Sequence, residues 1–209
     1  SYNELIINNQ DWKVKKLDID PLYFTNLSKK QKPPFLYIGC SDSRIPVDTF
    51  TQTEPGELFI HRNVANQISL TDMNILSVIQ YAVEVLEVEH IIICGHYGCG
   101  GVEAAYNDAA SGLVENWITP IKDLSVKNKR ELDKINSITE RINRLSEMNV
   151  IAQLENICKT SILRKSFKKE KYPKLHGWIL DIYEGSIKEL ILPIEDWKKI
   201  RLLPDNYRN

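Results

Sequence analysis

Three residues of this chain, Cys40, His96 and Cys99, have the types and positions of metal ligands. Cys40 follows the apolar run 35–39 and His96 follows the apolar run 91–95, so each is expected in a loop where a buried strand ends. Two thiolates and one imidazole suit zinc, and a zinc site with three protein ligands keeps its fourth position for water. The ligand count therefore predicts a catalytic zinc site rather than a structural one.

The short spacing between His96 and Cys99 lets one turn present both side chains to a single ion. The alternative interpretation is that Cys40 is a small core residue and His96 is a loop histidine bonded to the main chain. We disfavour this alternative because three candidate ligands come together at equivalent strand ends.

The other cysteines and histidines receive no chemical role. Cys94 lies inside an apolar strand and Cys158 follows an apolar helical pattern, so both are expected in the core. A single histidine beside a strand is more often hydrogen-bonded structurally than used in proton transfer. This interpretation applies to His61, His90 and His176.

Asp42 and Arg44 follow Cys40 closely enough for one short loop to bring an acid and a guanidinium to the metal. An arginine can hold a carboxylate through two parallel hydrogen bonds and keep it ionised. Held in this way, Asp42 could accept the proton of a zinc-bound hydroxide and aim its lone pair. Released from Arg44, it could become the fourth metal ligand. Elsewhere in a chain such a pair would be a surface ion pair that caps a turn.

Apolar runs and turn residues alternate along the chain. Strands are predicted at 35–38, 58–61 and 91–94, and a helix with Thr71 or Asp72 as its cap precedes the third strand. Strands that alternate with helices predict an α/β fold with a central, mostly parallel sheet flanked by helices. Ligands of such sheets collect beyond the carboxyl ends of the strands, which is where the candidate ligands lie.

Three further segments complete the predicted elements. Residues 2–30 form one or two amphipathic helices, 102–158 are mostly helical, and 178–192 form a terminal hairpin. Within the helical region, the charged stretch at about 122–147 is expected to form solvated faces.

The composition is that of one domain with a small-molecule partner. The chain has 209 residues, 43% of them hydrophobic, and we expect a single domain over 1–209 with an N-terminal helical arm at 1–34, a catalytic core at 35–193 and a C-terminal tail at 194–209. Its 27 basic and 28 acidic residues offer no footprint for nucleic acid. Four cysteines are too few for a disulfide scaffold and predict a reducing, cytoplasmic location, and no apolar run is long enough to cross a membrane.

Three motifs closely resemble those of the β-class carbonic anhydrases. They are Cys40-Ser41-Asp42-Ser43-Arg44, His61-Arg62-Asn63-Val64-Ala65-Asn66 and Gly95-His96-Tyr97-Gly98-Cys99-Gly100-Gly101. The resemblance implies that family's α/β fold and the zinc-dependent, reversible hydration of carbon dioxide to bicarbonate and a proton by a zinc-bound hydroxide.

The resemblance also implies residue roles and an assembly. Cys40, His96 and Cys99 match the zinc ligands, and Asp42 with Arg44 matches the catalytic dyad. Residues that match the substrate pocket are Gln31, Phe59, Val64, Tyr81 and the Gly100 N–H. Because a second chain supplies part of that pocket in this family, the resemblance implies a homodimer or a dimer-based tetramer.

One departure from the family concerns regulation. Some bacterial members carry an inhibitory bicarbonate site built from Trp, Arg and Tyr, and the matching positions here are Tyr37, Arg62 and Leu180. Since only the arginine is kept, we predict that this form of inhibition is absent.

Two alternative functions stay open at this point. Hydrolysis of carbon disulfide or carbonyl sulfide would use the same scaffold and zinc ligands. A zinc-stabilised, non-catalytic binding or redox-responsive module would have Asp42 closing the metal site.

Overall fold

The computed structural model describes residues 1–169 and 171–209, which form two compact units, Ser1–Lys32 and Pro33–Asn209. The first unit contains helices α1 (Tyr2–Ile19) and α2 (Tyr23–Leu27), which confirms the helices predicted within residues 2–30. Inside this unit Trp12 meets Tyr23 and Phe24 edge-on, with ring centroids 6.3 and 5.2 Å apart. These aromatic contacts hold α1 against α2.

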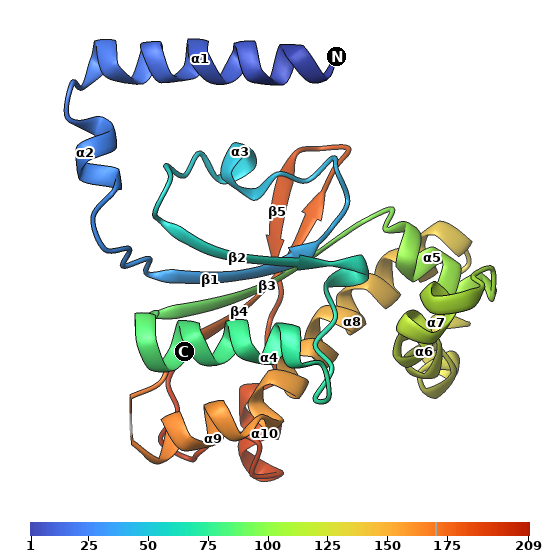
Figure 1. The fold of residues 1–209 in the computed structure, drawn as a ribbon. Helices are drawn as coiled ribbons and strands as arrows, with labels where there is room; N and C mark the ends of the chain where they lie inside the picture. Colours follow the sequence, from blue (N-terminus) through green and yellow to red (C-terminus); the bar gives the residue numbers. More distant parts are fainter. Residues whose placement is uncertain (170) are drawn as a thin grey trace. The chain divides into compact units, whose positions relative to one another are not determined.

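The second unit is built on a five-stranded sheet with the order β2-β1-β3-β4-β5 (Figure 1). The strands are β1 (Phe35–Cys40), β2 (Leu58–Asn63), β3 (His90–His96), β4 (Lys174–Asp181) and β5 (Ser186–Glu189). The first four are parallel, and β5 returns antiparallel to β4. The predicted α/β fold with a mostly parallel sheet and a terminal hairpin is therefore confirmed.

Helices connect and cover these strands. They are α3 (Val47–Thr51), α4 (Met73–Gln80), α5 (Gly100–Asn107), α6 (Gly112–Lys127), α7 (Lys129–Leu132), α8 (Ile138–Lys159), α9 (Ser161–Lys168) and α10 (Ile194–Lys199). A 3-10 turn, η1 (Val64–Asn66), follows β2, and a π-helix, η2 (Tyr81–Leu86), continues α4. Of the two predicted caps of α4 the structure uses Asp72, whose carboxylate accepts the Asn74 N–H at 2.9 Å. No helix in the described ranges combines the length and apolarity needed to span a membrane.

The central strands bury both of their faces, as parallel strands covered by helices must. Leu36 and Ile38 of β1 pack into one core layer with α4 and α8, whereas Tyr37 points into the other layer with α5 and α6. Cys94 and Cys158 are buried, which confirms their prediction as core residues.

One prediction for the charged stretch 122–147 is wrong at its end. Glu147 does not lie on a solvated face but is 8% exposed, because its side chain contacts Tyr97 and Lys188 from outside this stretch. A local charge pattern does not reveal partners that are distant in sequence.

Candidate metal centre

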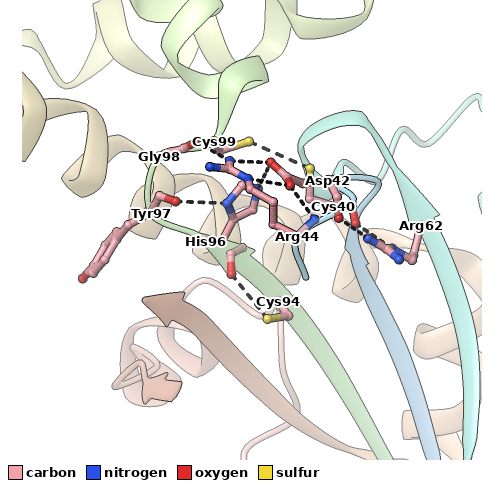
Figure 2. Close-up of polar contacts among 10 residues, drawn as sticks. Cys40, Asp42, Arg44, Arg62, Cys94, His96, Tyr97, Gly98 and Cys99 are labelled. Carbon is pink, nitrogen blue, oxygen red and sulfur yellow. Dashed lines mark hydrogen bonds and ion pairs between the residues drawn. The ribbon is translucent and has the colours of Figure 1, made fainter. Parts of the chain in front are cut away.

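The three candidate ligands meet at the carboxyl end of the parallel sheet. Cys40 is the last residue of β1 and His96 the last residue of β3, and these strands are paired in parallel, so the two residues leave the sheet side by side. Cys99 immediately precedes α5 (Figure 2). The two sulfur atoms are 3.9 Å apart, and one ligand atom from each residue lies within 4.8 Å of the others. All three residues are buried, so the cluster forms a compact donor set.

The orientation of His96 leaves one ring nitrogen available. Its Nδ1 lies 3.0 Å from the carbonyl oxygen of Tyr97, and only a protonated Nδ1 can donate to that acceptor. The lone pair is then on Nε2, which is fully buried and has no hydrogen-bond partner among the described residues. A buried polar atom without a partner is costly, and coordination of a metal ion would satisfy it.

The two thiols behave as one titrating pair. The hydrogen bond with Cys99 lowers the pKa of Cys40 to about 4 against the opposing effect of burial, and the same contact together with burial raises the pKa of Cys99. The N–H groups of Gly101 and Val102 at the start of α5 act in the other direction and favour a Cys99 thiolate. At least one sulfur atom therefore favours the thiolate, and the pair offers a donor site that a divalent cation can occupy.

Asp42 and Arg44 form the predicted two-pronged contact. Arg44 Nε donates to Asp42 Oδ1 at 2.9 Å and the second guanidinium nitrogen donates to Oδ2 at 2.6 Å, while the Arg44 main-chain N–H adds a third bond to Oδ1 at 2.9 Å. The hydrogen bond from Arg44 holds the pKa of Asp42 well below its usual range, so the carboxylate is ionised at neutral pH. Asp42 Oδ2 lies 3.8 Å from His96 Nε2. The carboxylate thus faces the ligand cluster while Arg44 holds it.

The loop between His96 and Cys99 is tied to the same arginine. Arg44 also donates to the carbonyl oxygen of Gly98 at 3.2 Å. Gly98 has a φ of +65°, a conformation that residues with a Cβ rarely adopt, so glycine lets this loop turn and expose its carbonyl group. Arg44 therefore connects the loop after β1 with the loop after β3.

Arg62 has a role in this site that its sequence context did not reveal. From β2 its Nε donates to the Cys40 carbonyl at 2.7 Å, and its terminal nitrogen donates to the Asp42 carbonyl at 2.5 Å. The guanidinium thus clamps the main chain that carries one ligand and the acid. Tyr37 and Leu180 are both buried, and the Tyr37 hydroxyl has no partner in the described part of the chain.

The predicted pocket residues lie outside the ligand cluster. The rings of Phe59 in β2 and Tyr81 in η2 are in tilted contact with centroids 5.7 Å apart, and Val64 begins η1. Val64 and Tyr81 are 40% and 43% exposed. Gly100 opens α5 beside Cys99, whereas Gln31 belongs to the first unit, where its role stays a prediction.

The remaining histidines are hydrogen-bonded, as the sequence predicted. His90 Nδ1 and His176 Nε2 lie 2.9 Å apart, and His176 Nδ1 lies 3.3 Å from Glu189. His61 Nε2 lies 3.4 Å from the Asn63 amide nitrogen.

Comparisons with known proteins agree on one family. The sequence model of the family described as "Carbonic anhydrase" matches residues 35–187. A carbonic anhydrase of Emericella nidulans is 40% identical over 190 residues, which is 91% of this chain and 83% of that protein. The crystal structure of the β-carbonic anhydrase CafA of Aspergillus fumigatus has a TM-score of 0.89 at 33% identity and covers 98% of this chain and 99% of its own. A Sordaria macrospora structure, described as one of two tetrameric β-carbonic anhydrases, has a TM-score of 0.87 at 37% identity and covers 90% of this chain and 96% of its own.

Proposed function

Since the chain belongs to the β-class carbonic anhydrases, a family of lyases, we propose that it hydrates carbon dioxide reversibly to bicarbonate and a proton with one zinc ion. Cys40, His96 and Cys99 hold that ion. The observation that carries the proposal is the buried Nε2 of His96, which has no hydrogen-bond partner among residues 1–169 and 171–209 and lies beside two thiols.

The spacing of the donor atoms supports zinc in particular. Tetrahedral zinc with Zn–S bonds of about 2.3 Å separates two sulfur ligands by roughly 3.8 Å. The sulfur atoms of Cys40 and Cys99 are 3.9 Å apart before any ion is considered. Two thiolates and one imidazole also form a soft donor set, which favours zinc over magnesium or calcium.

The bound ion and the residues around it have separate roles in the proposed reaction. Bound zinc supplies Lewis acidity, which lowers the pKa of water from about 15.7 toward roughly 7. Asp42, ionised and held by Arg44, accepts a hydrogen bond from the attacking oxygen and aims its lone pair at the carbon of carbon dioxide. An Asp42 carboxylate held by Arg44 in this way would leave a coordination position of the bound ion free for water. The Gly100 N–H at the start of α5 faces the oxygen that gains negative charge.

The apolar side chains Phe59, Val64 and Tyr81 line the pocket for carbon dioxide in this proposal, and the role of Gln31 in substrate binding rests on the family resemblance alone. The exposure of Val64 and Tyr81 suits a pocket that a second copy of the chain completes. We therefore propose a homodimer or a dimer-based tetramer, in line with the tetrameric description of the Sordaria macrospora relatives.

Inhibition by bicarbonate at the Tyr37, Arg62 and Leu180 positions is absent in this proposal. Arg62 already donates to two main-chain carbonyl groups, and Leu180 offers no hydroxyl group. Bicarbonate should therefore inhibit the enzyme only as a product, without cooperativity. Steep, cooperative inhibition near neutral pH would contradict this expectation.

Stopped-flow carbon dioxide hydration, measured against pH on protein of known zinc content, tests the proposed function. We expect a fast rate that increases with pH and scales with zinc occupancy. Inactivity at one zinc per chain across the pH range would contradict the proposal. Turnover of carbonyl sulfide or carbon disulfide by that same protein would then indicate the related hydrolase activity.

A further inference from the structure

Tyr97 connects the ligand loop to the protein interior at three points. Its carbonyl oxygen pairs with His96 Nδ1 at 3.0 Å, its N–H donates to the Leu180 carbonyl at 3.1 Å, and its hydroxyl donates to Glu147 Oε1 at 2.6 Å. Figure 2 shows its ring pointing away from Cys40 and Asp42. The side chain is therefore directed away from the site where substrate would react, while its main chain contacts a ligand.

Glu147 is a buried anion with several donors. It lies on α8 with 8% of its surface exposed, and it accepts hydrogen bonds from Lys188 at 2.6 Å, from Arg144 at 2.8 Å and from Tyr97. Burial alone would raise its pKa, but the bonds from Lys188, Tyr97 and Arg144 prevail and lower the pKa below its ordinary value. Glu147 is thus a charged and fixed acceptor for the Tyr97 hydroxyl at neutral pH.

We propose that Tyr97 and Glu147 are positioning residues that hold His96 in the orientation needed to bind zinc. The hydrogen bond from Tyr97 to Glu147 anchors the loop, and the anchored Tyr97 carbonyl keeps the proton of His96 on Nδ1 and its Nε2 directed at the ion. This inference rests on the proposed zinc site. Partners of this kind, bonded to the outer side of a metal ligand, commonly change metal affinity or activity by about 10- to 100-fold when removed.

If Tyr97 and Glu147 served only to stabilise the fold, their substitution would lower the free energy of unfolding without changing zinc release or ligand geometry. Tyr207 provides the matched control: it is a buried tyrosine whose hydroxyl accepts the Leu175 N–H at 3.0 Å at the opposite end of β4. Tyr207→Phe removes one buried hydroxyl without touching the ligand loop.

The experiment compares zinc release from the wild-type protein, Tyr97→Phe, Glu147→Gln, the double variant and Tyr207→Phe. The rate of transfer to a chromogenic chelator is measured, and the visible spectrum of the cobalt-substituted protein reports ligand geometry. We expect each single variant to release zinc about 10-fold faster and to shift the cobalt bands. The double variant should release zinc at about the same rate as the singles, since both changes act on the same hydrogen bond: Tyr97→Phe removes it, and Glu147→Gln replaces its charged acceptor with a neutral amide oxygen. Tyr207→Phe should match the wild type in both measurements.

Zinc release and cobalt spectra that are unchanged in both Tyr97→Phe and Glu147→Gln would overturn the inference. If one variant does not fold, the other still decides the question. Wild-type protein that binds no zinc would instead contradict the proposed function itself. The two failures are therefore distinguishable.

Discussion

Each end of β3 carries a histidine, and the two histidines differ in how their ring nitrogens are paired. His90 begins the strand and His96 ends it, about 20 Å apart for six residues at roughly 3.3 Å each. The His90 ring contacts the Phe35 ring at a tilt, and its Nδ1 lies 2.9 Å from Nε2 of His176. His96 is fully buried, and its Nε2 has no partner among the described residues. A histidine whose ring nitrogen is hydrogen-bonded to another side chain contributes to folding. A histidine with a buried ring nitrogen left unbonded beside two thiols has the geometry of a metal ligand.

Removing the sulfur ligand Cys40, which lies beside His96, should have the largest effect on zinc content and on activity. In Cys40→Ser we expect loss of zinc and at least about a 100-fold loss of hydration activity, since an alkoxide ligand does not form readily at neutral pH. Zinc content by elemental analysis and the stopped-flow rate measure both effects. Cys158→Ala is the control, because this buried cysteine of α8 lies outside the ligand cluster and should retain its zinc. Full zinc occupancy in Cys40→Ser would mean that the ligand assignment is wrong.

Removing the acid should affect turnover but not the metal. In Asp42→Ala we expect turnover to fall by about 100-fold while zinc remains bound. This loss is within the range of rate effects for side chains that take part in acid–base catalysis. Asp108→Ala breaks an exposed ion pair with Lys122 and should leave turnover unchanged. An unchanged rate at saturating carbon dioxide in Asp42→Ala would remove the assigned role.

Substituting His90, at the other end of β3, should have the smallest effect, and that effect should be on the free energy of unfolding alone. Burial, followed by the positive charges of His176 and Lys174, lowers the pKa of His90 against the opposing Glu89. Because the imidazole of His90 binds a proton more tightly in the unfolded chain, protonation favours unfolding. The contribution of neutral His90 to the free energy of unfolding is therefore complete above a pH of about 6.5 and is lost as the pH falls through the pKa of the folded state. His90→Gln should therefore reduce the loss of stability between pH 7.5 and 5.5.

Urea unfolding at these two pH values measures that difference. Zinc content should be the same in His90→Gln and the wild-type protein. An equal decline in stability on acidification in both proteins would show that His90 does not contribute to it.

The strands and the ligand cluster were predictable because their signals are local. Short apolar runs ending in Cys40 and His96 indicate both the buried strands and the edge of the sheet where the ligands meet. The identity of the residues then indicates the chemistry. The contact between Asp42 and Arg44 was predictable for the same reason, since one turn brings the two side chains together.

The contacts that support the site were not predictable, because they join distant parts of the chain. Glu147 lies in a charged stretch, and its partners Tyr97 and Lys188 are 50 residues before it and 41 residues after it. The pairing of His90 with His176 spans 86 residues. Local patterns place a residue on an element, but only the packed fold determines which distant group it meets.

Zinc-edge X-ray absorption of the wild-type protein tests most directly which end of β3 binds the ion. We expect two sulfur neighbours at about 2.3 Å, one imidazole nitrogen at about 2.0–2.1 Å and one further oxygen. A spectrum with two imidazole nitrogens and no sulfur would place the ion beside His90 and His176 and would contradict the site at Cys40, His96 and Cys99.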